Sequence, residues 1–392
     1  MRRQVDLYSD TRPFTAFETV SPDTPLELLN LNWRERDLPE RLRTKHVHRL
    51  HPYLGKFIPQ LVEIFLRKYA RRVVCDPFMG SGTTLVEANA LGYDAVGCDI
   101  SVFNCLLAGV KTASYDLPLL ERELKDILTA TELRVDPRSL YCEKMPATDN
   151  PYLRQWFAPP ALGELLAYRD LIPRYRYQEV MKVILSRAAR SARLTTHFDL
   201  DFPREPQRKP YYCHKHRRTC QPTTRALPFL RRYTLDTLRR IAEFAGLRTG
   251  GRVEIFWGDA REVPFPPCDT VITSPPYAGL IDYHEQHRYA FELLGLPDYS
   301  PREIGRTAMG TSRSAVAGYL EGISAVFRNV KRSLCPGGTV VIVVHDRDHL
   351  YPDLAATLGF EVEAVLQRHV NRRTGRRAGE FYEQVYIWRN PG

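Results

Sequence analysis

The stretch that decides the fold runs from residue 73 to 83 and reads VVCDPFMGSGT. Its first three residues form a short apolar run typical of a buried strand. Gly80 and Gly82 follow, and glycine permits a tight turn and close approach of the backbone to a ligand. A helix is expected over 83–91, then a second strand that ends at Asp99. Strand, glycine-rich turn, helix, strand and acid is the opening of a Rossmann-like unit.

The rest of the chain predicts an α/β core interrupted by a long insertion. Further strands are expected at 253–256, 269–273, 339–344, 361–367 and 384–388, with helices near 315–334 and 352–358. Between them, helical patterns recur near 117–132, 160–170, 178–193 and 233–246. We therefore divide the chain into an N-terminal extension (1–45), a core (46–110 and 250–392) and a largely helical insertion (111–249).

Composition narrows the class of protein. The 392 residues carry a formal net charge of +10, which favours a polyanionic partner, nucleic acid first. No apolar run approaches the roughly 20 residues needed to cross a bilayer, and the N-terminus lacks a signal-peptide pattern. The eight cysteines are scattered along the chain, as expected of reduced thiols. A cytoplasmic protein without membrane contact is the expectation.

Two further carboxylates support a nucleotide-type ligand at the glycine-rich turn. Asp99 is placed to accept both hydroxyls of a ribose, and Asp259, at the end of the third expected strand, is placed to hold an adenine. The helix start after the turn offers N–H groups to a negative group. The spacing is not GxGxxG and no P-loop lysine follows, so a dinucleotide or P-loop site is not indicated. Taken alone, the turn would also fit a mere β–α connection.

A second motif, Ser274-Pro275-Pro276-Tyr277, directly follows a predicted buried strand. Two prolines at a strand end make the backbone stiff, which also fits a simple strand terminator. The Ser274 hydroxyl and the Pro275 carbonyl are suited to accept the two hydrogens of a base amino group. Tyr277 is suited to stack on the base, an interaction worth about 1–3 kcal/mol. Such a pocket requires a flipped base and direct in-line transfer without a covalent enzyme intermediate.

Cys268 precedes the strand and is therefore not expected to be a nucleophile.

Together these motifs resemble those of the DNA amino-methyltransferases, and more narrowly the cytosine-N4 branch of restriction-modification enzymes. Asp76 to Thr83 looks like the cofactor motif of that family, and Ser274 to Tyr277 looks like its catalytic motif. The segment 51–59 is similar to the upstream part that closes over the methionine portion of the cofactor, with Phe57 and Pro59 at matching positions. The resemblance covers roughly 46–110 and 250–390.

The resemblance implies a Rossmann-like class I methyltransferase core with a mostly parallel seven-stranded sheet and S-adenosyl-L-methionine as cofactor. It also implies double-stranded DNA as substrate, a cognate restriction endonuclease as a further partner, and a nucleoid-associated location in a prokaryotic cell. The expected cofactor-binding residues are Phe57, Pro59, Asp76, Pro77, Phe78, Gly80, Gly82, Thr83, Asp99, Ile100, Asp259 and Ala260.

The acceptor base is not fixed by these motifs. In the family, serine at the first catalytic position is commoner for cytosine N4, and aspartate or asparagine for adenine N6. Adenine N6 and an RNA base amino group, such as guanine N2, are alternatives for the same core. A non-catalytic DNA-binding module is the least favoured hypothesis, because the residues of both motifs are intact.

A basic segment inside the insertion is the expected DNA-reading region. Residues 204–240 hold eleven Lys/Arg against two acids, with tyrosines interleaved. A solvated helical face is the alternative. The expected DNA contacts are Tyr212, Arg217, Arg218 and Arg225.

Two clusters of histidines invite a metal interpretation. Cys213, His214, His216 and Cys220 fall within eight residues, but neighbouring Cys213 and His214 cannot easily share one ion with the others. After the catalytic motif, His284 and His287 share a helix face without an evident third ligand. We expect no metal at either place, and pocket lining or helix packing for the second pair.

Overall fold

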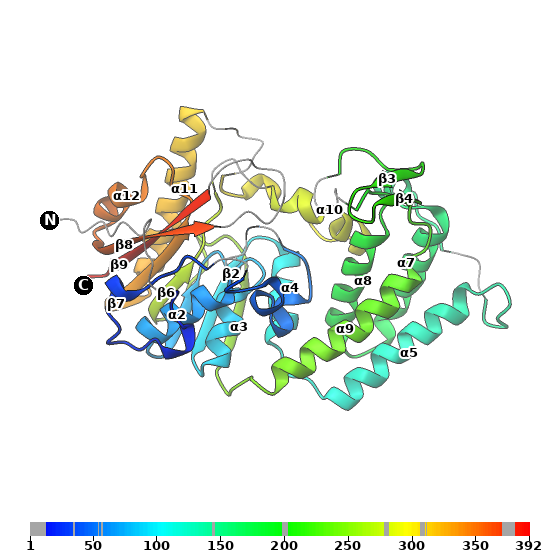
Figure 1. Ribbon diagram of the computed structural model, residues 1–392, viewed down its shortest axis with the longest axis horizontal. Helices are drawn as coiled ribbons and strands as arrows, with labels where there is room; N and C mark the ends of the chain where they lie inside the picture. Colours follow the sequence, from blue (N-terminus) through cyan, green and yellow to red (C-terminus); the bar gives the residue numbers. More distant parts are fainter. Residues whose placement is uncertain are drawn as a thin grey trace.

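The structure is a computed structural model that describes residues 13–33, 36–53, 55, 58–142, 146–197, 203–277, 282–305, 310, 312–370 and 381–392. Figure 1 shows two parts side by side. One is a sheet flanked by helices, and the other is a group of helices formed mainly by the middle of the chain. None of the described helices is long and apolar enough to span a bilayer.

Seven strands form one sheet in the order β5-β2-β1-β6-β7-β9-β8. The first five run parallel, whereas β9 is antiparallel to both β7 and β8. This is the mostly parallel α/β sheet expected from the sequence. Its strands are β1 (Val73–Asp76), β2 (Asp94–Asp99), β5 (Val253–Trp257), β6 (Cys268–Thr273), β7 (Leu334–Val344), β8 (Glu361–Val370) and β9 (Phe381–Arg389).

The strand order reverses between β1 and β6. From β1 the chain proceeds through β2 to β5 at one edge, and from β6 it proceeds through β7 in the opposite direction. In open α/β sheets, ligands bind beyond the carboxyl ends of the strands at such a switch point. The two motifs found in the sequence follow β1 and β6, so the topology brings them to the same place.

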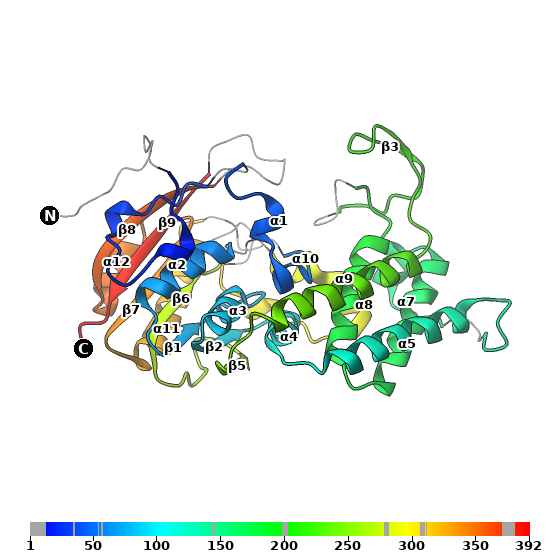
Figure 2. The same cartoon turned by 60° about the horizontal axis from the view of Figure 1, so that its bottom comes forward.

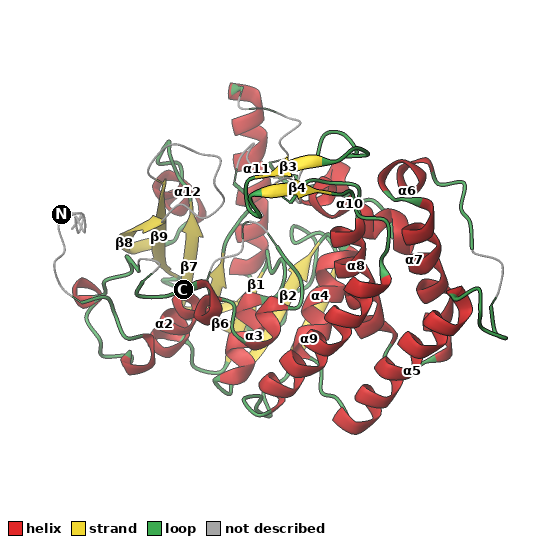
Figure 3. Ribbon diagram, turned by 45° about the vertical axis from the view of Figure 1, so that its right-hand side comes forward, coloured by secondary structure: helices red, strands yellow, loops and turns green. Residues whose placement is uncertain are grey.

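Helices cover both faces of the sheet (Figure 3). Along β7, Val341 and Val343 pack on one face, while Val340, Ile342 and Val344 pack on the other. Burial on both faces explains the continuous apolar run in this strand. The first face is covered by α2 (Pro59–Tyr69), α3 (Thr83–Ala90) and α4 (Val102–Thr112), and the second by α11 (Arg313–Lys331) and α12 (Tyr351–Leu358).

The helices of the middle segment share a core of their own. The helical patterns predicted there correspond to α5, α7, α8 and α9. Helix α10, which follows the Ser274–Tyr277 motif, also packs on this group, against α6 and α8. On α4, Phe103 and Leu107 belong to the same core, so this helix joins the two parts. The bounds are α5 (Leu117–Val135), α6 (Pro151–Trp156), α7 (Pro159–Leu171), α8 (Gln178–Ala192), α9 (Leu227–Ala245) and α10 (Tyr283–Leu294).

Two features differ from the sequence expectation. The stretch between α8 and α9 contains an antiparallel hairpin, β3 (Tyr211–Cys213) and β4 (Arg218–Cys220), that no alternating apolar pattern announces. Strand β7 begins at Leu334, before the expected start at residue 339. The remaining short elements are α1 (Glu40–Arg43) and the 3-10 turns at Phe17–Thr19, Leu26–Leu28, His46–Arg49, Ile172–Arg174 and Ser300–Arg302.

Candidate functional site

A cavity opens beyond the carboxyl ends of β1, β2, β5 and β6. Together with the part that is open to solvent, it takes in about 900 Å³ of space not filled by atoms. Its walls combine both motifs, because Gly80 and Ser274 line the same space. The lining residues are Tyr53, Gly55, Pro77, Phe78, Met79, Gly80, Ser81, Thr83, Asp99, Ile100, Ser101, Asn104, Gly258, Asp259, Ala260, Ser274, Pro276, Arg302, Glu303 and Ile304.

The glycine-rich turn requires both of its glycines. Gly80 and Gly82 have φ angles of 48° and 78°, in the left-handed region that side chains disfavour. A Cβ atom on Gly82 would lie 2.8 Å from the Cβ of Ala108 on α4, and one on Gly80 would lie 3.0 Å from the hydroxyl of Tyr53. Gly82 is therefore packed against α4 and does not line the cavity itself, whereas Gly80 does.

A buried lysine fixes the same turn. Lys111 on α4 is 1% exposed, and its Nζ donates a hydrogen bond of 2.6 Å to the carbonyl of Ser81. Hydrogen bonds from charged donors contribute more to stability than neutral ones. The sequence pattern did not single out Lys111, because its partner is thirty residues away in the chain.

Asp99 ends β2 on the cavity wall and is held in position by three donors. They are the Gly80 N–H at 3.0 Å, the Ser101 N–H at 2.8 Å and the Asn104 side-chain amide at 3.1 Å. Burial raises the pKa of Asp99 to about 6 and outweighs these hydrogen bonds, which act in the opposite direction. A carboxylate in this position is able to accept hydrogen bonds from a ligand.

Asp76 connects the two motifs rather than lining the cavity. Its carboxylate is fully buried and accepts hydrogen bonds from Thr273 Oγ1 at 2.6 Å and from the Phe78 N–H at 3.1 Å. Thr273 immediately precedes Ser274. The end of β1 and the start of the catalytic turn are thus tied by one side chain. Burial raises the pKa of Asp76 to about 6.

Asp259 lines the cavity, but its carboxylate already interacts with arginine side chains. Arg261 donates to both carboxylate oxygens, from Nε at 2.8 Å and from Nη2 at 2.5 Å, and Arg302 lies 3.5 Å away. Burial opposes the charge on Asp259, but the Arg261 hydrogen bonds and the two guanidinium charges together lower its pKa below the ordinary value. A role for Asp259 with adenine remains a prediction, and the adjacent Ala260 lines the same wall.

The turn of Ser274 to Tyr277 contributes two of its four residues to the cavity wall. Ser274 and Pro276 line it, whereas Pro275 is buried. The Tyr277 hydroxyl donates to the buried carboxylate of Glu383 on β9 at 2.9 Å. Tyr277 is therefore directed toward β9, and its stacking on a base stays a prediction. Cys268 begins β6, at the opposite end from Ser274, as the sequence indicated.

The upstream segment reaches the cavity through residues that the sequence analysis did not select. Tyr53 and Gly55 line the wall, whereas Pro59 begins α2, and Phe57 lies outside the described residues. The Tyr53 ring stacks on His287 of α10, with centroids 5.4 Å apart and planes at 19°. His287 is buried in an aromatic group, so it serves helix packing.

The four expected DNA contacts fall into two groups. Tyr212, Arg217 and Arg218 are exposed on the β3–β4 hairpin. Arg225 instead forms an ion pair with Glu164. Glu164 also accepts hydrogen bonds from the first N–H groups of α9. Arg225 therefore has a structural partner, and DNA contact at all four positions stays a prediction.

Comparison with known proteins identifies the family. A family model described as DNA methylase matches residues 52–108. The type II methyltransferase M.MjaII of Methanocaldococcus jannaschii is 37% identical over 431 aligned positions, which cover 89% of this chain and 81% of that protein. The chain belongs to the DNA amino-methyltransferase family. This methyltransferase is also similar to the type II methyltransferase M.MvaI of Kocuria varians, at 36% identity over 20% of the chain and 19% of that protein.

Solved structures match at low overall similarity. TrmN from Thermus thermophilus covers 89% of this methyltransferase, which matches 53% of that chain, with a TM-score of 0.37 and 13% identity. A DNA modification methylase from the same organism, TTHA0409, was solved in complex with S-adenosyl-L-methionine. It covers 34% of this methyltransferase, matching 54% of that chain, with a TM-score of 0.23 and 28% identity. The fold assignment of the methyltransferase rests on its own sheet order.

Proposed function

We propose that the protein is a site-specific DNA methyltransferase that transfers a methyl group from S-adenosyl-L-methionine to the N4 amino group of cytosine. The observation that carries this proposal is the shared cavity, which is lined by Ser274 and Pro276 as well as by Gly80 and Asp99. One cavity therefore holds both the features suited to the cofactor and those suited to a base amino group.

The wall near β1 and β2 fits the nucleoside part of the cofactor. Asp99 is fixed by three donors and presents a carboxylate to the two ribose hydroxyls. Phe78, Ile100 and Ile304 supply apolar surface in the same cavity, as a planar adenine requires. The backbone N–H groups at the start of α3 favour a negative group such as a carboxylate. When bound, S-adenosyl-L-methionine supplies an electrophilic methyl group.

The wall near β6 fits the acceptor. The Ser274 hydroxyl, on the cavity wall, accepts one hydrogen of the amino group. The carbonyl of Pro275, in the peptide bond to the lining residue Pro276, accepts the other, and the two bonds orient the nitrogen toward the methyl donor. Positioning and electrostatic complementarity are the main catalytic contributions in such a site. As the nitrogen forms its bond to the methyl carbon, the carbon–sulfur bond would break and its electron pair would stay on the sulfur of the departing S-adenosyl-L-homocysteine. The amino nitrogen would lose one proton to solvent water. The rigid Pro275-Pro276 backbone and the Asp76–Thr273 hydrogen bond hold the acceptors in place.

Cytosine is the favoured base because serine occupies the first position of the catalytic motif. The base has to leave the duplex to reach a cavity behind the strand ends, so base flipping belongs to the proposal. Two type II methyltransferases are among the relatives. We accordingly propose a cognate restriction endonuclease as the functional partner.

Incubation with methyl-labelled S-adenosyl-L-methionine and mixed-sequence DNA, followed by nucleoside mass spectrometry, tests the proposal. We expect N4-methylcytosine at one sequence context and no label in RNA. Label confined to N6-methyladenine would refute cytosine as the acceptor and favour adenine. Label confined to RNA would refute DNA as the substrate.

A further inference from the structure

The segment between α8 and α9 has almost no apolar core of its own. Between Thr195 and Arg225, the only buried hydrophobic side chains in the described part are Cys213 and Cys220. Strands β3 and β4 pair through only three residues each. An isolated two-stranded hairpin is at best marginally stable in water. Figure 2 shows the hairpin extending away from the helices. Interactions other than apolar packing must therefore hold it.

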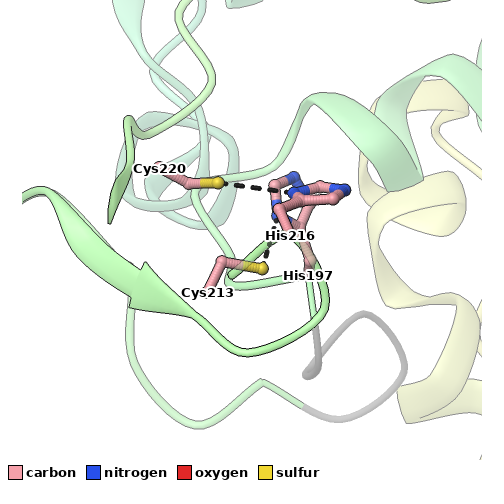
Figure 4. A group of neighbouring side chains, drawn as sticks. All are labelled: His197, Cys213, His216 and Cys220. Atoms are coloured by element: carbon pink, nitrogen blue, oxygen red, sulfur yellow. Dashed lines mark hydrogen bonds between the residues drawn. The ribbon is translucent and has the colours of Figure 1, made fainter. Parts of the chain in front are cut away.

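Two histidines converge on these two cysteines (Figure 4). Nδ1 of His197 lies 3.4 Å from the sulfur of Cys213, and Nδ1 of His216 lies 3.4 Å from the sulfur of Cys220. All four ligand atoms lie within 4.8 Å of one another. In tetrahedral zinc sites, bond lengths of about 2.0–2.1 Å to nitrogen and about 2.3 Å to sulfur place neighbouring N and S atoms about 3.6 Å apart. The cluster thus has the dimensions of a tetrahedral metal centre.

We propose that His197, Cys213, His216 and Cys220 bind one Zn²⁺ ion. Two thiolates and two imidazoles are a ligand set that zinc favours over oxygen-seeking cations. Because protein side chains fill all four positions, the site is structural and leaves no position for a reacting water. Binding releases one proton from each cysteine thiol, so two thiolates balance the charge of the ion.

This ligand set avoids the steric problem seen in the sequence, where neighbouring Cys213 and His214 would have to bind the same ion. Neighbouring Cys213 and His214 do not share the centre, because His214 contacts the ring of Tyr212 instead. The fourth ligand is His197, sixteen residues before Cys213. The pairs are then His197 with Cys213 and His216 with Cys220, one ligand from outside the hairpin and three from within it.

A second group of possible metal ligands, His46, His48 and Glu87, already has a cation beside it. There the Nζ of Lys45 lies 2.7 Å from the Glu87 carboxylate, so an ammonium group already occupies the place of a cation.

The zinc ion would fix the hairpin on which Tyr212, Arg217 and Arg218 are exposed. Arg217 has a φ of 52°, a conformation that a free loop would readily leave. Removal of zinc should therefore loosen the hairpin without disturbing the cavity at the sheet. A lower affinity for DNA is expected only if the proposed function is also correct.

The first test is metal analysis of the full-length protein purified under reducing conditions. Mass spectrometry of the metal content should find one zinc per chain, and Co²⁺ substitution should give the visible absorption of a tetrahedral thiolate site. Cys213→Ser and Cys220→Ser should each lose most of the metal. His214→Ala, adjacent to the cluster, and Cys142→Ser, at an exposed cysteine, are matched controls that should keep it.

The proposal is overturned if the wild-type protein holds no zinc, if Cys213→Ser retains a full equivalent, or if thiol titration finds Cys213 and Cys220 joined in a disulfide. Should the cysteine variants fail to fold, chelation of the wild-type protein provides the second test. One equivalent of zinc should be released, and new protease cleavage should appear between 203 and 225. Binding of S-adenosyl-L-methionine should be unchanged. Release without increased cleavage would contradict a structural site. Lack of cofactor binding before chelation would instead count against the proposed function.

Discussion

Replacing Gly82 by alanine tests the packing that shapes the cofactor turn. The left-handed φ of 78° costs a residue with a Cβ atom about 1–2 kcal/mol. The new Cβ would also lie 2.8 Å from Ala108 Cβ and 3.1 Å from its Cα, and forcing such overlap costs about 1–3 kcal/mol. We therefore expect the free energy of unfolding to fall by about 2–5 kcal/mol.

Gly92 provides the matched control, because it has a φ of 88° but no atom within 4 Å of its Cβ position. Gly92→Ala should show only the backbone cost of about 1–2 kcal/mol. Urea unfolding of both variants, with calorimetric titration of S-adenosyl-L-methionine, separates the two contributions. Gly82→Ala should lose at least about tenfold in cofactor affinity, equivalent to about 1.4 kcal/mol, and Gly92→Ala should keep the wild-type value. Equal stability and equal affinity in the two variants would refute the reasoning.

Three further predictions follow from the site. In the proposed site, the charged form of Asp99 is the one that accepts both ribose hydroxyls. Because burial raises the pKa of Asp99 to about 6, cofactor affinity measured by calorimetry should then fall as pH drops below 6. Asp99→Asn should bind weakly with a flatter profile, the remaining slope coming from Asp76. Lys111→Met removes the charged donor to Ser81 and should lower the free energy of unfolding by about 1.5–3 kcal/mol in urea titrations. The double variant Arg217→Ala/Arg218→Ala should reduce the salt dependence of DNA binding, followed by fluorescence anisotropy, by a slope of about 2.

Each of these predictions has a contrary result. A wild-type pH profile in Asp99→Asn would remove that carboxylate from the ribose site. Unchanged stability of Lys111→Met would mean that the turn does not depend on the buried ammonium. An unchanged salt slope in the arginine variant would place the DNA surface elsewhere.

The parts of the fold that were predictable are those encoded by neighbouring residues. The apolar run, the two glycines and Asp99 follow one another within 73–99, so their local preferences determine β1, the turn, α3 and β2 together. The strand run in β7 was equally clear because both of its faces are buried. These local signals placed both motifs at strand ends, and their meeting in one cavity follows from the strand order.

The missed features depend on contacts between distant segments. The stack of Tyr53 on His287 joins positions 234 residues apart, and no local pattern marks either partner. Pocket lining or helix packing was predicted for His287, and in the fold its buried ring contacts the rings of Tyr53 and Phe103. The β3–β4 hairpin lacks the alternating apolar residues by which strands are recognised, because its buried side chains are cysteines. His197 joins them only through the folded chain.

The rate of methyl transfer by Ser274→Ala, measured in a single turnover beside its affinity for S-adenosyl-L-methionine, tests the central claim most directly. Ser274, Asp99 and Gly80 line the same cavity, and the proposal assigns Ser274 to the acceptor base and the other two to the cofactor. We predict that transfer to cytosine slows by about 10²-fold or more, as when a positioned hydrogen-bonding group is lost from an active site, while cofactor affinity stays within about twofold of wild type. Wild-type transfer by this variant would contradict the assignment of Ser274 to the reacting site.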